Sequence, residues 1–276
     1  MKLPDDFQFN QSNLQDYVDC RRRFQYRHVM RLAWPGIEAE PVIEHERFLK
    51  LGGELHRMIQ QHVLGVSQAR LSLLARDEDL KRWWENYLHH PIKDLPGLKQ
   101  AEESMSTPLA GHRLVAKYDL LAIEPGVRAV IVDWKATRRR PSRTFLAQRL
   151  QTRVYPYVFF RASLDQRFYI LEGAGQVEMI YWFAEDPHNP ERFLYDDDQF
   201  EADEVYLSSL IEEIKGLGES EFNRTAEELN CLFCRYRSLC QRGIRAGSFQ
   251  DWTQEIDESE ELSFDFDFDQ VAEIEF

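Results

Sequence analysis

The chain has 276 residues, 43% of them hydrophobic and 13% aromatic, which is enough to bury the core of one large domain and excludes an intrinsically disordered protein. No stretch approaches the roughly 18 apolar residues of a membrane span, and no basic and apolar signal region is found at the start, so we expect a cytoplasmic protein without membrane contact. Because that compartment is reducing, the four cysteines are expected to be metal ligands or free thiols rather than disulfides.

The net charge of −14 is concentrated towards the end of the chain. Residues 246–276 hold eleven acidic residues and no Lys or Arg, so 37 of the 48 acidic residues remain to face the 34 basic ones in residues 1–245. Such a near-neutral body, with arginine clusters at 21–23 and 138–143, can bind phosphates, although a solvated surface explains these clusters equally well. We predict a folded domain over residues 1–245 and an acidic, flexible tail over residues 246–276.

The tail alternates aromatic and acidic residues in SFDFDFDQVAEIEF, residues 263–276. This composition is typical of a disordered, solubilising segment. Two other interpretations stay open. The carboxylates can imitate a DNA backbone and occupy a basic groove of the same chain, or the aromatic residues can dock on a protein partner.

The first part of the domain is predicted to be helical. Ser12 followed by Gln15 indicates a capping box that opens a helix reaching Tyr26. Residues 44–64 predict a second helix despite Gly52 and Gly53, each of which costs about 1 kcal/mol in a helix, so a close approach of another backbone is the expected reason for the pair. Residues 77–90 predict a third helix that Pro91 ends.

After these helices the sequence pattern changes from that of helices to that of strands, which indicates a sheet. Residues 101–108, 113–123 and 128–133 are short, β-rich runs separated by turn residues, and the last two predict a hairpin. A long helix is expected from Ser142 to about Ala162, with Pro156 as a candidate bend. Residues 176–185 predict another strand and residues 200–217 an amphipathic helix. The fold class is therefore mixed α/β (α+β), with one central sheet flanked by helices.

Two strand ends carry the residues that indicate chemistry. Asp119 lies on one strand of the predicted hairpin, and Asp133 and Lys135 lie at the end of the next, on the same side of it. Two carboxylates and the Trp134 carbonyl make an oxygen site suited to Mg²⁺ or Mn²⁺, and a neighbouring lysine can stabilise charge on a phosphate. D-x-K also arises by chance, and Asp119 can equally be a salt-bridge residue.

These residues resemble the PD-(D/E)XK nuclease superfamily, and in detail its RecB-like branch. The sequence GGELH at 52–56 is similar to the helical G-x-x-H element of that branch, and Asp133-Trp134-Lys135 is similar to its D-x-K. Asp119 matches the preceding aspartate, although Ala116 replaces the usual glycine before it. Residues 151–155, QTRVY, resemble the Q-x-x-x-Y element on the following helix.

The resemblance implies a restriction-endonuclease-like core and a role for each matched residue. His56, Asp119, Asp133 and the Trp134 carbonyl would hold Mg²⁺ or Mn²⁺, and Asp119, Asp133 and Lys135 would be catalytic. Gln151 and Tyr155 would contact DNA. Independently of the family, Arg138 and Arg139 follow Lys135 closely and are candidates for phosphate binding without sequence readout. Glu102 or Glu103 can add a carboxylate to the metal site.

The cysteines add a further resemblance. Cys231, Cys234 and Cys240 have C-x2-C-x5-C spacing, and Cys20 lies far upstream. A subset of RecB-like nucleases, including AddB-type and CRISPR-associated RecB-like exonucleases, has the same arrangement and binds a [4Fe-4S] cluster with it. Four thiolates can also hold zinc, and this alternative stays open.

The function expected from this resemblance is metal-dependent DNA cleavage, exonuclease-like on single strands or ends, with a structural [4Fe-4S] cluster that clasps the two ends of the domain. DNA repair, recombination or CRISPR adaptation would be the setting. The alternative is a DNA-binding or assembly subunit whose nuclease site is inactive or auxiliary. A zinc-stapled protein of unrelated activity is a third hypothesis.

Overall fold

The computed structural model describes residues 3–4, 6–33, 40–137, 140–165, 171–232 and 234–243. The predicted tail, residues 246–276, lies outside them. The helices are α1 Gln11–Asp19, α2 Arg21–Phe24, α3 Glu40–Val63, α4 Gln68–Ser72, α5 Glu78–His89, α6 Arg143–Gln148, α7 Leu150–Asp165 and α8 Asp197–Gly216, with a π-helical turn at Gln25–Val29. The strands are β1 Gln8–Asn10, β2 Leu98–Leu109, β3 His112–Glu124, β4 Arg128–Lys135, β5 Val177–Phe183 and β6 Glu191–Leu194.

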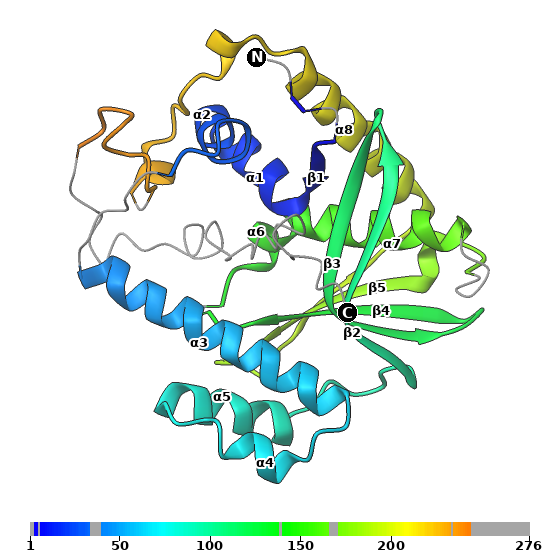
Figure 1. The fold of residues 1–276 in the computed structure, drawn as a ribbon. Coiled ribbons are helices and arrows are strands. Elements are labelled where there is room, and N and C mark those ends of the chain that lie inside the picture. The colour runs from blue at the N-terminus through cyan, green and yellow to red at the C-terminus, as the bar shows by residue number, and fades with distance from the viewer. Residues whose placement is uncertain are drawn as a thin grey trace, which may run out of the picture.

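These elements form three layers around one six-stranded sheet (Figure 1). Apolar side chains of α1, α7 and α8 pack on one face of the sheet, and those of α3, α4 and α5 pack on the other. The predicted mixed α/β architecture, with a central mixed sheet flanked by helices, is confirmed.

The long strand β3 organises the sheet. It pairs with β2 in antiparallel fashion along almost its whole length. The hairpin turns at Ala110 and Gly111, whose φ values of 50° and 77° are those that a two-residue turn requires. On its other edge β3 pairs with β1 at residues 113–115 and with β4 at residues 120–124. Asp119 therefore lies where this edge passes from one partner strand to the other.

Strand β4 lies inside the sheet, antiparallel to β3 and parallel to β5, to which α6 and α7 connect it. Its apolar sequence AVIVDW suits a strand that is buried on both faces. Ile131 packs in the core against α7, and Val132 packs in the core beneath α3 and α5. By the alternation of a strand, Asp133 and Lys135 follow Ile131 and face α7.

The N-terminal helix differs from the prediction at both ends. Asn10 rather than Ser12 caps it: the Asn10 side chain accepts from the Asn13 N–H, and the Asn13 side chain accepts from the Asn10 N–H. The helix ends at Asp19, because Cys20 is extended, with φ −164° and ψ 107°, before α2 begins. The apolar pattern continues across this break, so periodicity alone predicts one helix.

The long helix predicted from Ser142 to Ala162 is two helices. Ser142 caps α6 by accepting from the Phe145 N–H, as its position before the helix suggests. Arg149, with ψ 141°, then separates α6 from α7. Pro156 lies inside α7, so the break comes before it rather than at it.

The glycine pair predicts a close approach, and Gly52 makes one. A Cβ on Gly52 would lie 3.3 Å from Cβ of Ala136, a side-chain atom rather than the expected backbone, directly after β4. We expect Gly52→Leu to lower the free energy of unfolding by about 1–3 kcal/mol, because the added side chain pushes α3 away from this segment. Urea unfolding measures the loss.

The matched control is Gly216→Leu at the last residue of α8, where a Cβ would meet nothing within 4 Å. Its unfolding free energy should change by less than about 0.5 kcal/mol. Equal urea midpoints for the two leucine variants would contradict a specific role for Gly52.

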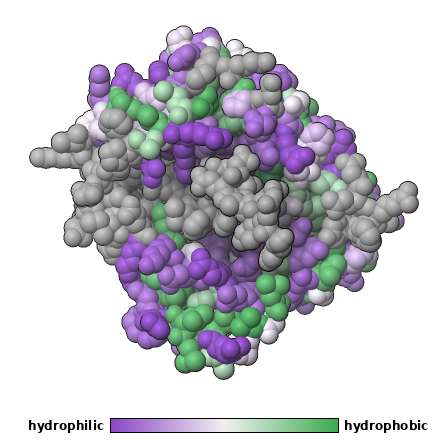
Figure 2. Space-filling view, in the orientation of Figure 1, coloured by the Kyte–Doolittle hydropathy of each residue, from purple (hydrophilic) through white to green (hydrophobic). Residues whose placement is uncertain are grey.

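On the face shown in Figure 2, hydrophilic and hydrophobic residues are intermixed. Large exposed apolar side chains include Leu64, Leu73 and Leu74, near the end of α3 and around α4. None of the described helices combines the length and the apolar character that crossing a membrane needs.

Candidate active site

Both backbone polar groups of Trp134 have side-chain partners in the site. Its N–H donates to Oδ2 of Asp119 at 2.8 Å, and its carbonyl oxygen lies 2.7 Å from Nε2 of His56. Nδ1 of His56 is 3.3 Å from Oδ1 of Asp119. Three of the four predicted metal-binding groups, one each from α3, β3 and β4, therefore meet at one point.

A local change in the β2–β3 hairpin makes this meeting possible. Tyr118 packs in the core against α7, whereas Leu120, two residues later, packs in the core beneath α3. The alternation of β3 side chains between the two faces of the sheet thus reverses at Asp119. Opposite it, Glu102 lies between residues that pair with Leu120 and Tyr118 and has a left-handed backbone, with φ 57°. A residue other than glycine in this conformation within a strand is strained, and such strain tends to occur at functional sites.

Glu102 joins the group as a further carboxylate. One ligand atom each from His56, Asp119 and Glu102 lies within 4.8 Å of the other two. Nζ of Lys117 lies 2.6 Å from Oε2 of Glu102. The sequence left the choice between Glu102 and Glu103 open, and the signal that decides it is the hairpin register, which places residue 102 opposite residue 119.

Electrostatics favour a charged pair at this point. Burial would lower the pKa of His56, but the carboxylates of Asp119 and Asp133 outweigh it and raise that pKa to about 9. Burial would likewise raise the pKa of Asp119, but His56 and the Trp134 N–H hold it below its usual range. The His56 imidazolium thus stabilises the Asp119 carboxylate. A metal cation can bind the imidazole nitrogen only when His56 has lost a proton.

Asp133, Lys135 and Gln151 form a buried trio beside this group, in which each side chain contacts the other two. Nζ of Lys135 lies 3.2 Å from Oδ2 of Asp133 and donates to Oε1 of Gln151 at 3.0 Å. Nε2 of Gln151 donates to Oδ1 of Asp133 at 2.6 Å. All three side chains are buried, which is tolerable for charged groups only when they are paired in this way.

The other predicted DNA-binding residues have the following places. Tyr155 is buried, and its hydroxyl accepts from Nε2 of Gln11 at 3.2 Å. Arg138 and Arg139 fall outside the described residues. Farther along the same arginine cluster, Arg140 and Arg143 both pair with Glu191 of β6, which reduces their availability for phosphates.

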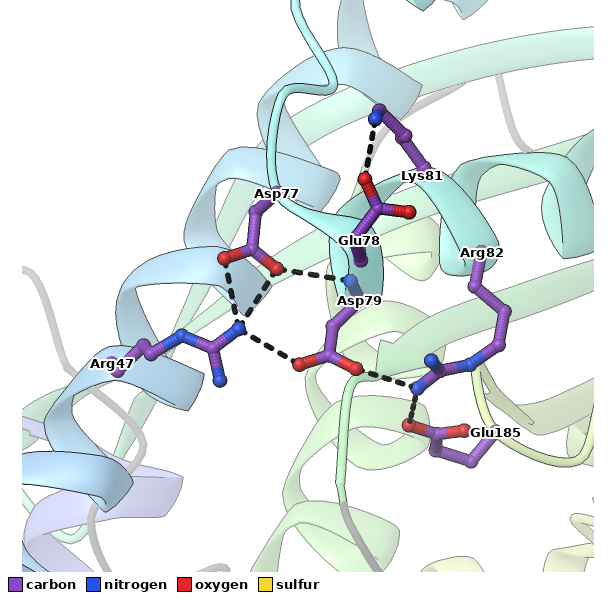
Figure 3. Close-up of polar contacts among 7 residues, drawn as sticks. All are labelled: Arg47, Asp77, Glu78, Asp79, Lys81, Arg82 and Glu185. Atoms are coloured by element: carbon purple, nitrogen blue, oxygen red, sulfur yellow. Dashed lines mark hydrogen bonds and ion pairs between the residues drawn. The ribbon is translucent and has the colours of Figure 1, made fainter.

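A network of ion pairs fixes the helix that carries the site histidine (Figure 3). Arg47 of α3 contacts Asp77 at 2.8 Å and Asp79 at 2.9 Å, around the start of α5. Arg82 contacts Asp79 at 2.9 Å and, at 2.6 Å, Glu185 in the segment after β5. Single exposed pairs contribute little, but a linked set restrains the elements that it joins. The network therefore ties α3 and α5 to the end of the sheet at which the site lies.

The four cysteines line a pocket built from residues near both ends of the described chain. Arginines surround it: Arg23, Arg224, Arg237 and Arg242. Nη1 of Arg242 donates to Sγ of Cys231 at 3.3 Å. Burial raises the pKa of the Cys234 thiol to about 12, against the opposing effect of the Arg23 guanidinium. Burial thus outweighs the arginine at Cys234 and favours its neutral thiol, while all four cysteines lie in one pocket that cationic side chains line.

Among solved structures, the chain is similar to a candidate exonuclease from Eubacterium rectale, at 11% identity and a TM-score of 0.48, with 82% of this chain and 86% of that chain covered. It is also similar to the protein SSO0001, at 12% identity and a TM-score of 0.42, with 85% and 86% covered. A search of curated protein sequences finds no match. A family model described as the PD-(D/E)XK nuclease superfamily matches residues 8–241, most of the chain. The protein therefore belongs to the PD-(D/E)XK nuclease superfamily.

Proposed function

We propose that the protein is a Mg²⁺- or Mn²⁺-dependent DNA nuclease of the RecB-like branch, with exonuclease-like action on single strands or ends. The observation that carries the proposal is the convergence of these side chains on the backbone of Trp134. Asp119 accepts from the Trp134 N–H, His56 contacts the Trp134 carbonyl oxygen, and the Asp133–Lys135–Gln151 trio lies directly beside them.

The donor set fits a hard divalent cation. It offers carboxylates of Asp119 and Glu102, an imidazole nitrogen of His56 and the Trp134 carbonyl oxygen, with Asp133 adjacent. Oxygen-rich sets of this kind suit Mg²⁺ and Mn²⁺, and the imidazole is compatible with Mn²⁺ in particular. Such an ion supplies charge stabilisation for the phosphate that is attacked.

The side chains of the protein would orient the water molecule and stabilise charge on the phosphate. Lys135 is held by Asp133 and Gln151, so its ammonium group has a fixed direction from which it can orient a water molecule and stabilise charge on a phosphate oxygen. Gln151 holds both partners of this pair at once. Because the trio comes from the end of β4 and from the first turn of α7, the scissile phosphate would lie beside that end of the strand.

We further propose that Cys20, Cys231, Cys234 and Cys240 bind a [4Fe-4S] cluster. The four cysteines line one pocket with arginines around them, which fits a cluster whose thiolate ligands carry negative charge. The cluster would be structural, because it would join the end of α1 to the segment after α8.

Metal removal tests the nuclease function. Labelled single-stranded DNA should be degraded in the presence of Mn²⁺ or Mg²⁺, should be left intact after treatment with EDTA, and should be degraded again when the metal is restored. Binding of DNA without cleavage under either metal would overturn the proposal and favour the alternative of a DNA-binding or assembly subunit. Degradation that is unaffected by EDTA would contradict the metal dependence.

A further inference from the structure

The helix α1 has one polar stripe that no proposed catalytic role uses. Gln11, Gln15 and Asp19 are spaced four residues apart and therefore share a face of the helix. The stripe is internally connected, because Nε2 of Gln15 donates to Oδ1 of Asp19 at 2.8 Å. Leu14 and Tyr17 on the same helix pack in the core, so the stripe is distinct from the apolar side of α1.

Each member of this stripe contacts α7 or the break that precedes it. Oε1 of Gln15 accepts from the Leu150 N–H at 3.0 Å. Gln11 donates to the Tyr155 hydroxyl at 3.2 Å, and Oδ2 of Asp19 lies 3.9 Å from Nη1 of Arg149. One face of α1 thus follows the first turns of α7 over its whole length.

The contact of Gln15 falls at the point where α7 begins. The break at Arg149 makes Leu150 the first residue of a new helix, and the first N–H groups of a helix have no partner within it. A side-chain oxygen from another element satisfies this N–H and thereby fixes where the new helix starts. The next residue is Gln151, which bonds to both Lys135 and Asp133.

The far end of the stripe is anchored at the cysteine pocket. Asp19 pairs with Arg23 at 2.7 Å, and its carbonyl oxygen accepts from the Asn230 side chain at 3.1 Å. Arg23 and Asn230 both line the pocket, as does Cys20, the residue that follows Asp19. A rigid two-turn helix therefore has one end in the cysteine pocket and its polar stripe on the helix that carries Gln151.

We propose that Gln15 is a positioning residue of the nuclease site: it holds the first turn of α7, and with it Gln151, against Lys135 and Asp133, while the cysteine pocket anchors the helix from which it acts. This inference rests on the function proposed above. It adds a group that touches neither the phosphate nor the metal and acts only through the geometry of Gln151.

The test is a double-mutant cycle on DNA cleavage with Mn²⁺. Gln15→Met removes the acceptor but keeps the length of the side chain, and it should lower kcat about tenfold, with less than a twofold change in KM. In a Gln151→Met background the same substitution should change kcat less than twofold, because Gln15 acts on Lys135 through Gln151, which is already replaced. A purely structural role would lower kcat by the same factor in both backgrounds, and that result would overturn the inference.

Gln25→Met is the matched control. Gln25 is a buried glutamine of the same N-terminal region whose Nε2 donates to the Glu219 carbonyl at 2.9 Å, away from α7. It should lose thermal stability as Gln15→Met does but keep kcat within twofold of the wild type. Equal kcat values for the two variants would overturn the positioning role.

Hydrogen exchange gives a readout that does not depend on cleavage. The amides at the start of α7 should exchange faster in Gln15→Met than in Gln25→Met, and unchanged exchange would overturn the inference. If the wild type cleaves and these differences are missing, the positioning role fails while the nuclease function stands. If the wild type never cleaves DNA, the proposed function fails, and the positioning role fails with it.

Discussion

Replacing Lys135 by methionine is expected to lower the kcat of DNA cleavage by at least about 10²–10³-fold. The ammonium group is the buried cation that lies 3.2 Å from Asp133 and 3.0 Å from Gln151, so its position is fixed before a substrate arrives. Methionine keeps the bulk of the side chain but leaves nothing to orient water or to stabilise charge on a phosphate oxygen. Steady-state cleavage of labelled single-stranded DNA with saturating Mn²⁺ measures the effect.

Loss of Lys135 also leaves the Asp133 carboxylate buried without its cation, which costs stability. The variant must therefore be assayed well below its melting temperature. Lys215→Met is the matched control, because Nζ of Lys215 bonds to the Ala110 carbonyl and to Glu212, far from the trio in the fold. A folded Lys135→Met protein that cleaves within tenfold of the wild type would contradict the proposed role.

Replacing Cys20 by alanine is expected to remove the bound iron as completely as replacing Cys234. The two residues are far apart in sequence but line the same pocket, so each would supply one of four ligands. A link that closes a loop of about 200 residues stabilises a fold by roughly 5 kcal/mol through chain entropy, and this contribution should be lost in both variants. Iron analysis and visible absorbance after anaerobic purification, followed by thermal unfolding, measure both effects.

Val18→Ala is the control for a substitution at this end of α1, because Val18 is exposed on the same helix. It should keep the full iron content. A brown wild-type protein whose Cys20→Ala variant keeps its colour would show that the fourth ligand lies elsewhere. A colourless wild type with bound zinc would replace the cluster by the zinc alternative.

Much of this arrangement could be predicted because it depends on local patterns. The apolar run before Asp133 and the alternation of strand residues predict a buried strand end with Asp133 and Lys135 on one side, and the structure places them so. The central sheet follows from the same period. Short elements such as β1, β6 and α4 contain too few residues to show a period, so they were not predicted.

What the sequence does not reveal depends on single backbone conformations. Cys20 and Arg149 interrupt apolar patterns that continue on both sides, and neither is a proline or a glycine. Glu102 reaches the site only because its φ is positive and because the alternation of β3 reverses at Asp119. These features come from tertiary contacts, which local propensity does not encode.

The contact of His56 with the Trp134 carbonyl oxygen limits how this site can change through mutation. The oxygen offered there belongs to the main chain, so no substitution at position 134 can delete it. The indole packs against Trp182 and Tyr87 in the core beneath α3, and a substitution alters only how firmly that packing holds the oxygen in place. The position of one proposed metal ligand, the Trp134 carbonyl oxygen, is therefore determined by hydrophobic packing rather than by the identity of a polar residue.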